Sequence, residues 1–255
     1  MSSHQDVIQE LRLDLAAGLR WAARHNLHEG VDNHFSIAVP DEDGISRGER
    51  FLINPYGWHW SEITASCLVY CDKDGNVLEG DNWVEDTAFH IHSKVHIAKP
   101  DAKVVLHTHQ PYATAICTRK NGRLQMAEQN ALMFKDRIAY DDTYNGLAAN
   151  SDEGERIART MGNRSVGFLA GHGVVVCGGS MAEAYTDLYY LERAAMFQIM
   201  AGSNGGELNE VAEDVQVLTA QQMADDRPLL TSRHFNALRR ILDKEEIGRA
   251  SCRER

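Results

Sequence analysis

The chain has 255 residues, of which 43% are hydrophobic and 25% are charged, and its formal net charge is −11. This length and composition are typical of a globular protein with one large domain or two small ones. The acidic balance argues against a general nucleic-acid-binding protein, which needs a basic surface. No apolar segment approaches the length of a membrane span.

The N-terminus and the cysteines predict a cytoplasmic protein. Residues 1–15 lack the basic start and the apolar centre of a signal peptide. The five cysteines are an odd number and are widely scattered, a pattern that suits reduced thiols better than a disulfide framework. Cys67 and Cys71 stand close together without a second pair, so we expect small buried side chains there and not a metal site.

The first half of the chain predicts a helix, several strands and a second helix. Apolar residues recur at helical spacing through about residue 25. HFSIAVP and RFLINP have the pattern of short strands, and SCLVYCDKDGNVLEG that of a hairpin with an Asp-Gly-Asn turn. The next helix is expected over residues 85–98, because Pro100 disfavours helix at the residue before it. KVVLH then follows as a buried strand.

The second half continues the alternation of helices and strands. PYATAICTRKNG predicts a helix, DRIAY a strand, and Tyr144-Asn145-Gly146 a turn. Ser151 followed by acidic residues marks a helix start, and SVGFLAGHGVVVCGG predicts two strands. A capping box at Ser180 opens a long helix through Met200. The interleaved pattern predicts a layered α/β domain.

The C-terminal region is expected to be less regular. Residues 202–225 are polar, which favours loops, and RHFNALRRILDKEE predicts a last helix. Residues 246–255, EIGRASCRER, are basic and unpatterned and resemble an appended reading-frame tail. We therefore expect one domain over residues 1–240 and a partly non-native tail over residues 241–255.

Two histidines one residue apart, His107 and His109, end the apolar run KVVL. Residues i and i+2 of a strand point to the same face, so the two imidazoles can share a cation. His172, between two glycines, is the best third ligand for a catalytic type of metal site. The chain holds 12 histidines, so chance pairs are expected, and spacing alone leaves a hydrogen-bonded structural role equally open.

His92 and His96 are four residues apart on the predicted helix and share one of its faces. They could form a wall of the site or transfer protons, and His92 is the stronger candidate for that role. The competing interpretation, which we favour for the pair, places one of them in a packed interface and leaves the other exposed.

Four segments resemble the class II aldolase/adducin domain, in the same order along the chain. They are HFSIAVP, FLINPYGWHWSEITASCLV, AFHIHSKVHIAKPDAKVVLHTH and GFLAGHGVVVCGGSMAEAY. The resemblance implies a single three-layer α/β/α domain with a mostly antiparallel or mixed sheet. It also implies a homotetramer with active sites at subunit interfaces. The implied cofactor is a divalent metal, zinc first and manganese, iron or cobalt as alternatives, bound by His107, His109 and His172.

The departures from the family pattern concern the catalytic acid/base and the phosphate site. The metal-binding, proton-transferring glutamate of the sugar-phosphate aldolases falls on Ala88, and the two serines before it fall on Asp86 and Thr87. The usual Gly-Asn of the phosphate loop is Asn33-His34. An aspartate repels a phosphate, so a phosphorylated substrate is disfavoured and the chain is closer to the adducin-like bacterial branch.

We therefore predict a metal-dependent lyase that cleaves a C–C bond of a small hydroxy or oxo compound, with the metal stabilising an enediolate. A decarboxylase or dehydratase with the same site, or a non-catalytic adducin-like interaction domain, is the alternative. The acid/base candidates, in falling order, are His92, Glu85, Asp86, His34 and Tyr144. The substrate-binding candidates are His34, Asn54, Tyr56 and Gly57, although Trp58 and Trp60 beside them could equally cover the core edge.

Overall fold

The computed structural model describes residues 3–146 and 151–245. Its centre is an eight-stranded sheet in the order β4-β3-β2-β1-β5-β8-β7-β6. Neighbouring strands are antiparallel except β6 and β7, which are parallel. The strands are β1 (His34–Ala38), β2 (Arg50–Ile53), β3 (Val69–Asp72), β4 (Val77–Glu79), β5 (Val104–Thr108), β6 (Ile138–Asp141), β7 (Val166–Leu169) and β8 (Gly173–Gly178). The mixed, mostly antiparallel sheet confirms the prediction.

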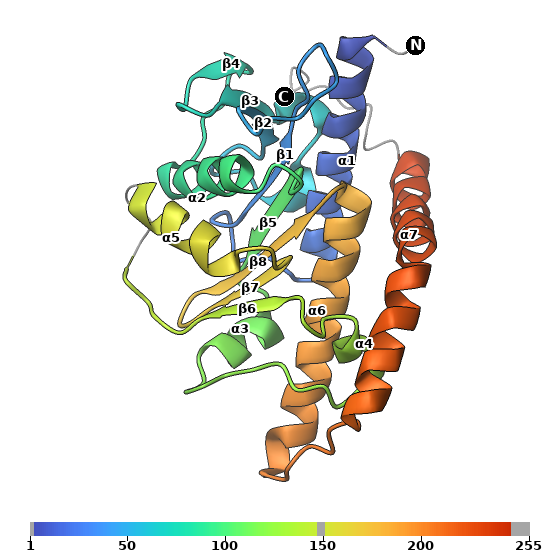
Figure 1. Cartoon of the computed structure of the whole chain (residues 1–255). Helices are drawn as coiled ribbons and strands as arrows, with labels where there is room; N and C mark the ends of the chain where they lie inside the picture. The colour runs from blue at the N-terminus through green and yellow to red at the C-terminus, as the bar shows by residue number, and fades with distance from the viewer. Residues whose placement is uncertain (1–2, 147–150, 246–255) are drawn as a thin grey trace.

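Helices cover both faces of this sheet, as predicted for three layers (Figure 1). The helices are α1 (His4–Arg24), α2 (Asp86–Ala98), α3 (Pro111–Cys117), α4 (Gln129–Leu132), α5 (Ser151–Met161), α6 (Met181–Ala201) and α7 (Glu213–Lys244), with short 3-10 turns η1 (Trp60–Glu62), η2 (Ala65–Cys67) and η3 (Gly202–Asn204). Helices α2 and α5 lie on one face, whereas α1 and α6 lie on the other, with α7 outside α6 (Figure 1). None of the helices in the described part of the chain is long and apolar enough to cross a membrane.

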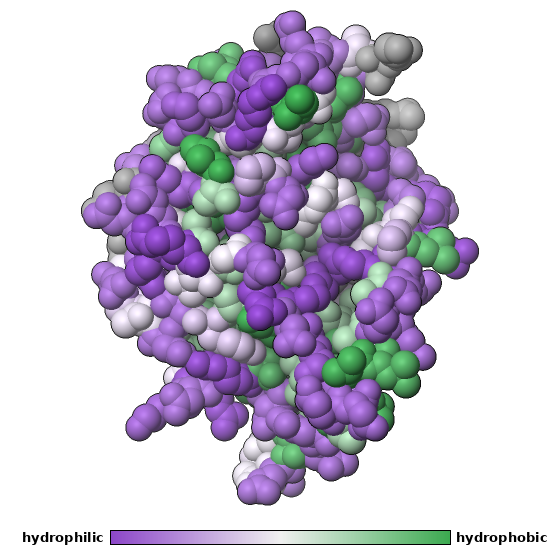
Figure 2. Space-filling model, viewed as in Figure 1, coloured by the Kyte–Doolittle hydropathy of each residue, from purple (hydrophilic) through white to green (hydrophobic). Residues whose placement is uncertain are grey.

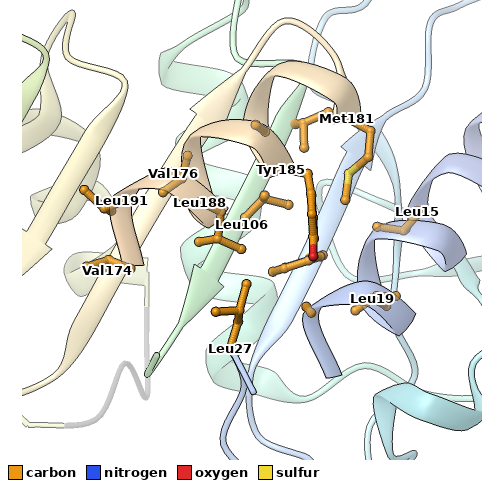
Figure 3. Close-up of a cluster of buried hydrophobic side chains, with 14 of the residues drawn as sticks. Leu15, Leu19, Leu27, Leu106, Val174, Val176, Met181, Tyr185, Leu188 and Leu191 are labelled. Atoms are coloured by element: carbon orange, nitrogen blue, oxygen red, sulfur yellow. The ribbon is translucent and has the colours of Figure 1, made fainter. Parts of the chain in front are cut away.

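The larger core lies between the sheet and helices α1 and α6. Tyr185 of α6 stands at its centre, among leucines of both helices and the valines of β8 (Figure 3). The Tyr185 hydroxyl is 2.9 Å from Nδ1 of His25, so this buried tyrosine keeps a hydrogen-bond partner. Trp60 is also fully buried and packs against Phe35 in this core, which agrees with the interpretation that it covers the core.

The alternation of β5 decides where the histidine pair points. Val104 and Leu106 belong to the core under α6, whereas Val105 packs with Ile91 and Val95 of α2 on the opposite face. His107 shares the face of Val105, because side chains two residues apart point the same way. The apolar KVVL run thus anchors the strand, and the imidazole of His107 emerges on the side of α2 and α5.

The expectation of loops over residues 202–225 is wrong for its second half. Helix α7 begins at Glu213 and not near Arg233, and it continues through Pro228 to Lys244. Its first half shows little amphipathic pattern because only Gln216 of it is buried, whereas Phe235, Leu238 and Leu242 anchor the second half. The expected domain boundary at residue 240 falls inside this helix, and residues 246–255 of the predicted tail lie outside the described residues.

Candidate metal centre

Three histidines from two separate parts of the chain meet at the end of β5. His107 lies on β5, His109 directly follows this strand, and His172 lies in the tight turn between β7 and β8. One ring nitrogen from each imidazole lies within 4.8 Å of the other two. The ring centroids are 4.6–5.1 Å apart. The structure therefore brings together the three histidines that the sequence predicts as metal ligands.

Each of these imidazoles can present one ring nitrogen to the cluster. Nδ1 of His107 donates to the carbonyl oxygen of Val174 at 3.0 Å, so Nε2 of the neutral ring carries the lone pair. Nε2 of His109 is buried and has no hydrogen-bond partner among the described residues. A buried polar nitrogen without a partner is costly, and a cation bound there would supply one. Three imidazoles with open lone pairs are a donor set that fits a divalent metal.

Gly173 allows the close approach on which this cluster depends. A Cβ atom at residue 173 would lie 2.4 Å from the carbonyl oxygen of Thr108 and 2.8 Å from Cδ2 of His109. Gly171, on the other side of His172, has a φ of +66°, a conformation that other residues rarely adopt. The Gly-His-Gly sequence is thus what turns the chain tightly enough to place His172 beside β5.

Burial lowers the pKa of all three imidazoles. The pKa of His172 falls to about 4, because burial and the neighbouring His109 both disfavour its charged form. Burial also holds the pKa of His107 well below its usual value and lowers that of His109. Neutral imidazole is the form that binds a metal ion, so all three side chains are ready to bind one at neutral pH.

Carboxylates lie around the cluster, and within the described residues none joins the three histidines as a possible ligand. Glu29 and Asp32 act on His109, and Glu153 acts on His172, each partly opposing the lowering of the histidine pKa. Glu153 is itself bonded to Arg156, whose Nε donates to it at 2.8 Å. This ion pair lowers the pKa of Glu153 and keeps it ionised.

Three further histidines are buried behind the cluster. His34 of β1 is paired with His107 on the neighbouring strand β5, and the two rings stack with centroids 5.0 Å apart. Nδ1 of His34 is 2.9 Å from Nε2 of His92. His92 and His96 are both buried and both lie within hydrogen-bond distance of Oγ of Ser36. The expectation that one histidine of the α2 pair is exposed is wrong, because the face they share packs directly on β1.

The remaining acid/base candidates lie at the start of α2 or at the rim of the cluster. Glu85 is the N-cap of α2, and its carboxylate accepts from the backbone N–H of Ala88 at 2.8 Å. Asp86 is exposed in the first turn. Tyr144 is 53% exposed, and its ring centroid lies 6.3 Å from that of His172. Of these three, only Tyr144 has a recorded contact with the three-histidine cluster.

The substrate-binding candidates next to β2 have different surroundings. Asn54 is buried and bonds with the backbone of Asn33 and Phe35, so it fixes the entry of the chain into β1. The ring of Tyr56 packs edge-on against Trp83, and Gly57 is exposed with a φ of +81°. Asn54 therefore holds the backbone on both sides of His34.

Two groups close to the cluster were absent from the predicted site. Oδ1 of Asn33 accepts from the backbone N–H groups of Glu29 and His109, which ties the loop before β1 to the end of β5. Glu153 was interpreted only as a helix-start residue, since it stands in the acidic first turn of α5. The sequence offers no local signal for the contact of Asn33 with His109 or for that of Glu153 with His172, because each joins residues of different elements.

The family model described as class II aldolase and adducin N-terminal domain matches residues 13–199. The chain belongs to this family. A "Putative aldolase class 2 protein" of Caulobacter vibrioides is 35% identical over 243 residues, which cover 94% of this chain and 92% of the relative. The decarboxylase NovR of Streptomyces niveus is 28% identical over 206 residues, 77% of this chain and 76% of that protein.

The crystal structure of an aldolase II superfamily protein from Pseudomonas syringae has the same fold. Its TM-score is 0.85 at 35% identity, with 94% of each chain covered. Within this class II aldolase fold, Ala88 packs in an apolar cluster with Phe51, Ile53 and Val69. The position at which the sugar-phosphate aldolases are expected to carry a glutamate is therefore part of the core in this chain.

Proposed function

We propose that this protein is a metal-dependent lyase that cleaves a C–C bond of a small, non-phosphorylated hydroxy or oxo compound in an aldol-type reaction. The observation that carries the proposal is the convergence of His107, His109 and His172, with Nε2 of His109 buried and unpartnered. These three side chains would hold the divalent metal, zinc first and manganese, iron or cobalt as alternatives. When bound, the metal would act as a Lewis acid towards a substrate oxygen.

The charges around the site support a substrate without a phosphate group. Glu29 and Asp32 lie near His109, and Glu153 neutralises Arg156 on the side of His172. Asp86 stands where the family's phosphate-binding serine would be expected, and a second negative charge there is repulsive. The surroundings of the cluster thus offer a phosphate dianion little net attraction.

Among the acid/base candidates, the contacts favour His34 and Tyr144 over the others as groups that reach the substrate. His34 stacks on the predicted ligand His107, and Tyr144 lies at the open rim beside His172. His92 is fully buried, and both of its ring nitrogens are engaged. We therefore propose that His92 acts through His34, and that Glu85 and Asp86 organise the start of α2.

Metal analysis of gently purified protein tests the metal site directly. About one metal ion per chain is expected in the wild-type protein, and far less than one per chain in His107→Ala. His90→Ala, a change of the same kind on the half-buried face of α2, is the control and should keep its metal. A wild-type protein without metal, or a His107→Ala variant that retains it, would contradict the site.

A panel of hydroxy and oxo acids, assayed with metal-loaded and metal-stripped protein, separates the possible reactions. Products of C–C cleavage support the lyase, whereas carbon dioxide or loss of water supports a decarboxylase or dehydratase. The decarboxylase alternative is favoured by the similarity to NovR. Activity that survives both chelation and His109→Ala is incompatible with this mechanism. An intact metal site without turnover of any substrate supports a non-catalytic adducin-like role.

We further propose a cytoplasmic homo-oligomer, a tetramer as is common in the family. The face shown in Figure 2 is mostly polar, with separate apolar patches, and the four cysteines in the described part of the chain are buried and form no disulfide with one another. Light scattering on the eluting protein should give four times the chain mass of 28.5 kDa. A monomer would contradict the proposed assembly, and fractionation of cells tests the location.

A further inference from the structure

Four hydrogen bonds join His34, which stacks on the candidate ligand His107, to a backbone carbonyl in the connection between α2 and β5. Nδ1 of His96 lies 3.0 Å from the carbonyl oxygen of Ala102, and Nε2 of His96 lies 2.7 Å from Oγ of Ser36. The same Oγ lies 2.5 Å from Nδ1 of His92, and Nε2 of His92 lies 2.9 Å from Nδ1 of His34. We call His34, His92, His96 and Ser36 the buried histidine–serine chain.

The carbonyl at its end fixes the direction of every hydrogen bond in this chain. A carbonyl oxygen only accepts, so Nδ1 of His96 carries a proton and Nε2 of the neutral ring accepts from the Ser36 hydroxyl. That hydroxyl has a single proton, so its oxygen must accept from Nδ1 of His92. Nε2 of His92 then accepts from Nδ1 of His34, which leaves Nε2 of His34 as a bare lone pair.

Burial keeps each ring in the neutral state that this assignment needs. Ser36, His92 and His96 are buried, and His34 is only 4% exposed. Burial lowers the pKa of His96 to about 4 and holds that of His92 well below its usual value, and His34 is enclosed in the same way, against the rings of His92 and His107. The three rings are therefore uncharged at neutral pH, and each has one donor and one acceptor nitrogen.

The bare nitrogen belongs to the ring nearest the metal centre. His34 and His107 are directly opposite each other in the register of β1 and β5, and their rings stack at an interplanar angle of 29°. The hydrogen bond to His92 uses Nδ1. Nε2 is therefore the ring atom left to meet a ligand of the cluster.

We propose that the buried histidine–serine chain is a positioning relay that holds His34 in the Nδ1–H tautomer, so that its Nε2 accepts a hydrogen bond from a hydroxyl group of the ligand at the metal centre. The role towards the ligand rests on the proposed function, whereas the tautomer is a property of the protein alone. The relay makes His34 a specificity-determining residue. A ligand with a hydroxyl group next to its metal-binding oxygen can donate to Nε2, and an O-methylated analogue cannot.

The tautomer can be read directly from ring-nitrogen chemical shifts in uniformly 15N-labelled protein. Two-bond proton–nitrogen spectra distinguish an unprotonated ring nitrogen, which resonates well downfield, from a protonated one. We expect Nε2 of His34 to be unprotonated in the wild-type protein. In Ser36→Ala the direction of the chain is no longer fixed, and the ratio of the two His34 tautomers should change at least about fivefold, which corresponds to one net hydrogen bond.

Thr186→Val is the matched control for the loss of a buried hydroxyl. Thr186 is fully buried on α6, and its hydroxyl bonds with Nδ1 of His234 at 3.0 Å, so its loss should leave the His34 signals unchanged. If Ser36→Ala does not fold, Ser36→Cys replaces the hydroxyl by a thiol, which is a weak donor of similar shape. A protonated Nε2 of His34 in the wild-type protein, or a tautomer that Ser36→Ala leaves unchanged, overturns the relay.

Glycolate and methoxyacetate, titrated into zinc-loaded protein, test the role towards the ligand. Glycolate should bind more tightly than methoxyacetate, and Ser36→Ala should reduce this discrimination about three- to tenfold relative to the wild-type protein and Thr186→Val. An unchanged discrimination in Ser36→Ala overturns the acceptor role of His34. If neither acid binds although zinc is bound, the proposed ligand class fails, while the tautomer measurement still decides the relay.

Discussion

Replacing Gly173 by alanine tests whether the close approach of β5 and β8 is what brings the imidazoles together. The added Cβ would lie 2.4 Å from the carbonyl oxygen of Thr108 and 2.8 Å from the ring of His109, whereas ordinary contacts begin at 3.4 Å. The strand ends must therefore separate by about 1 Å. Metal–ligand distances tolerate only about 0.2 Å, so we expect the variant to lose most of its metal affinity. The overpacking should also cost about 1–3 kcal/mol of stability.

Metal affinity is measured by competition with a chromophoric chelator, and the free energy of unfolding by urea denaturation of the metal-free protein. Gly202→Ala is the matched control, because a Cβ at residue 202 meets nothing within 4 Å. It should leave both quantities unchanged. Wild-type metal affinity in Gly173→Ala would refute the reasoning, since His109 and His172 would then reach the metal without the close approach.

Two further predictions concern buried groups behind the site. The pKa of His96 falls to about 4 on burial, so the unfolded chain takes up this proton at higher pH than the folded protein. The free energy of unfolding of the metal-free protein should therefore fall by about 3 kcal/mol through His96 as the pH falls from about 6.5 to about 4. In His96→Gln, the free energy of unfolding measured by urea denaturation should depend less steeply on pH over this range, by the equivalent of one proton. Ala88→Glu should destabilise the protein by at least about 2 kcal/mol in the same assay, because the carboxylate enters the apolar cluster around Phe51. Ile97→Glu, on the exposed face of α2, is its control, and an equal loss in both variants would contradict this account of residue 88.

The three candidate metal ligands could be named from local signals in the sequence, although the spacing alone left a structural role equally open and the family resemblance decided in favour of a metal. The two-residue period of a strand places His107 and His109 on one face, and the glycines around His172 mark a tight turn. The order of the strands has no such signal. That β8 pairs with β5, which joins the two halves of the site, depends on packing between segments more than 60 residues apart.

Residues whose role depends on such packing escaped prediction. Ser36 has the appearance of an ordinary polar residue in a strand, and only the register of β1 against β5 and the placement of α2 over it show that it joins two histidines. Only one of His92 and His96 was expected to be buried. Their spacing shows that they share a face of the helix, but it does not show how much of that face packs against the sheet. The predicted last helix was shorter than α7 for a related reason. A helix that packs through only a few residues lacks a continuous apolar stripe that would mark it in the sequence.

The packing of Ala88 excludes a carboxylate from this position and directs attention to the acceptor that we propose at His34. A side chain of Ala88 directed into the cluster of Phe51, Ile53 and Val69 cannot be exchanged for a carboxylate without opening that core. A site that has given up this carboxylate needs another fixed acceptor, and the buried histidine–serine chain ends in one at Nε2 of His34. The three imidazoles and this acceptor are neutral, so the charge of a bound cation would be opposed only from a distance, by the carboxylates of Glu29, Asp32 and Glu153 around the cluster. The same carboxylates repel a doubly charged group, so a hydroxy or oxo compound with at most one negative charge suits this site better than a phosphate ester.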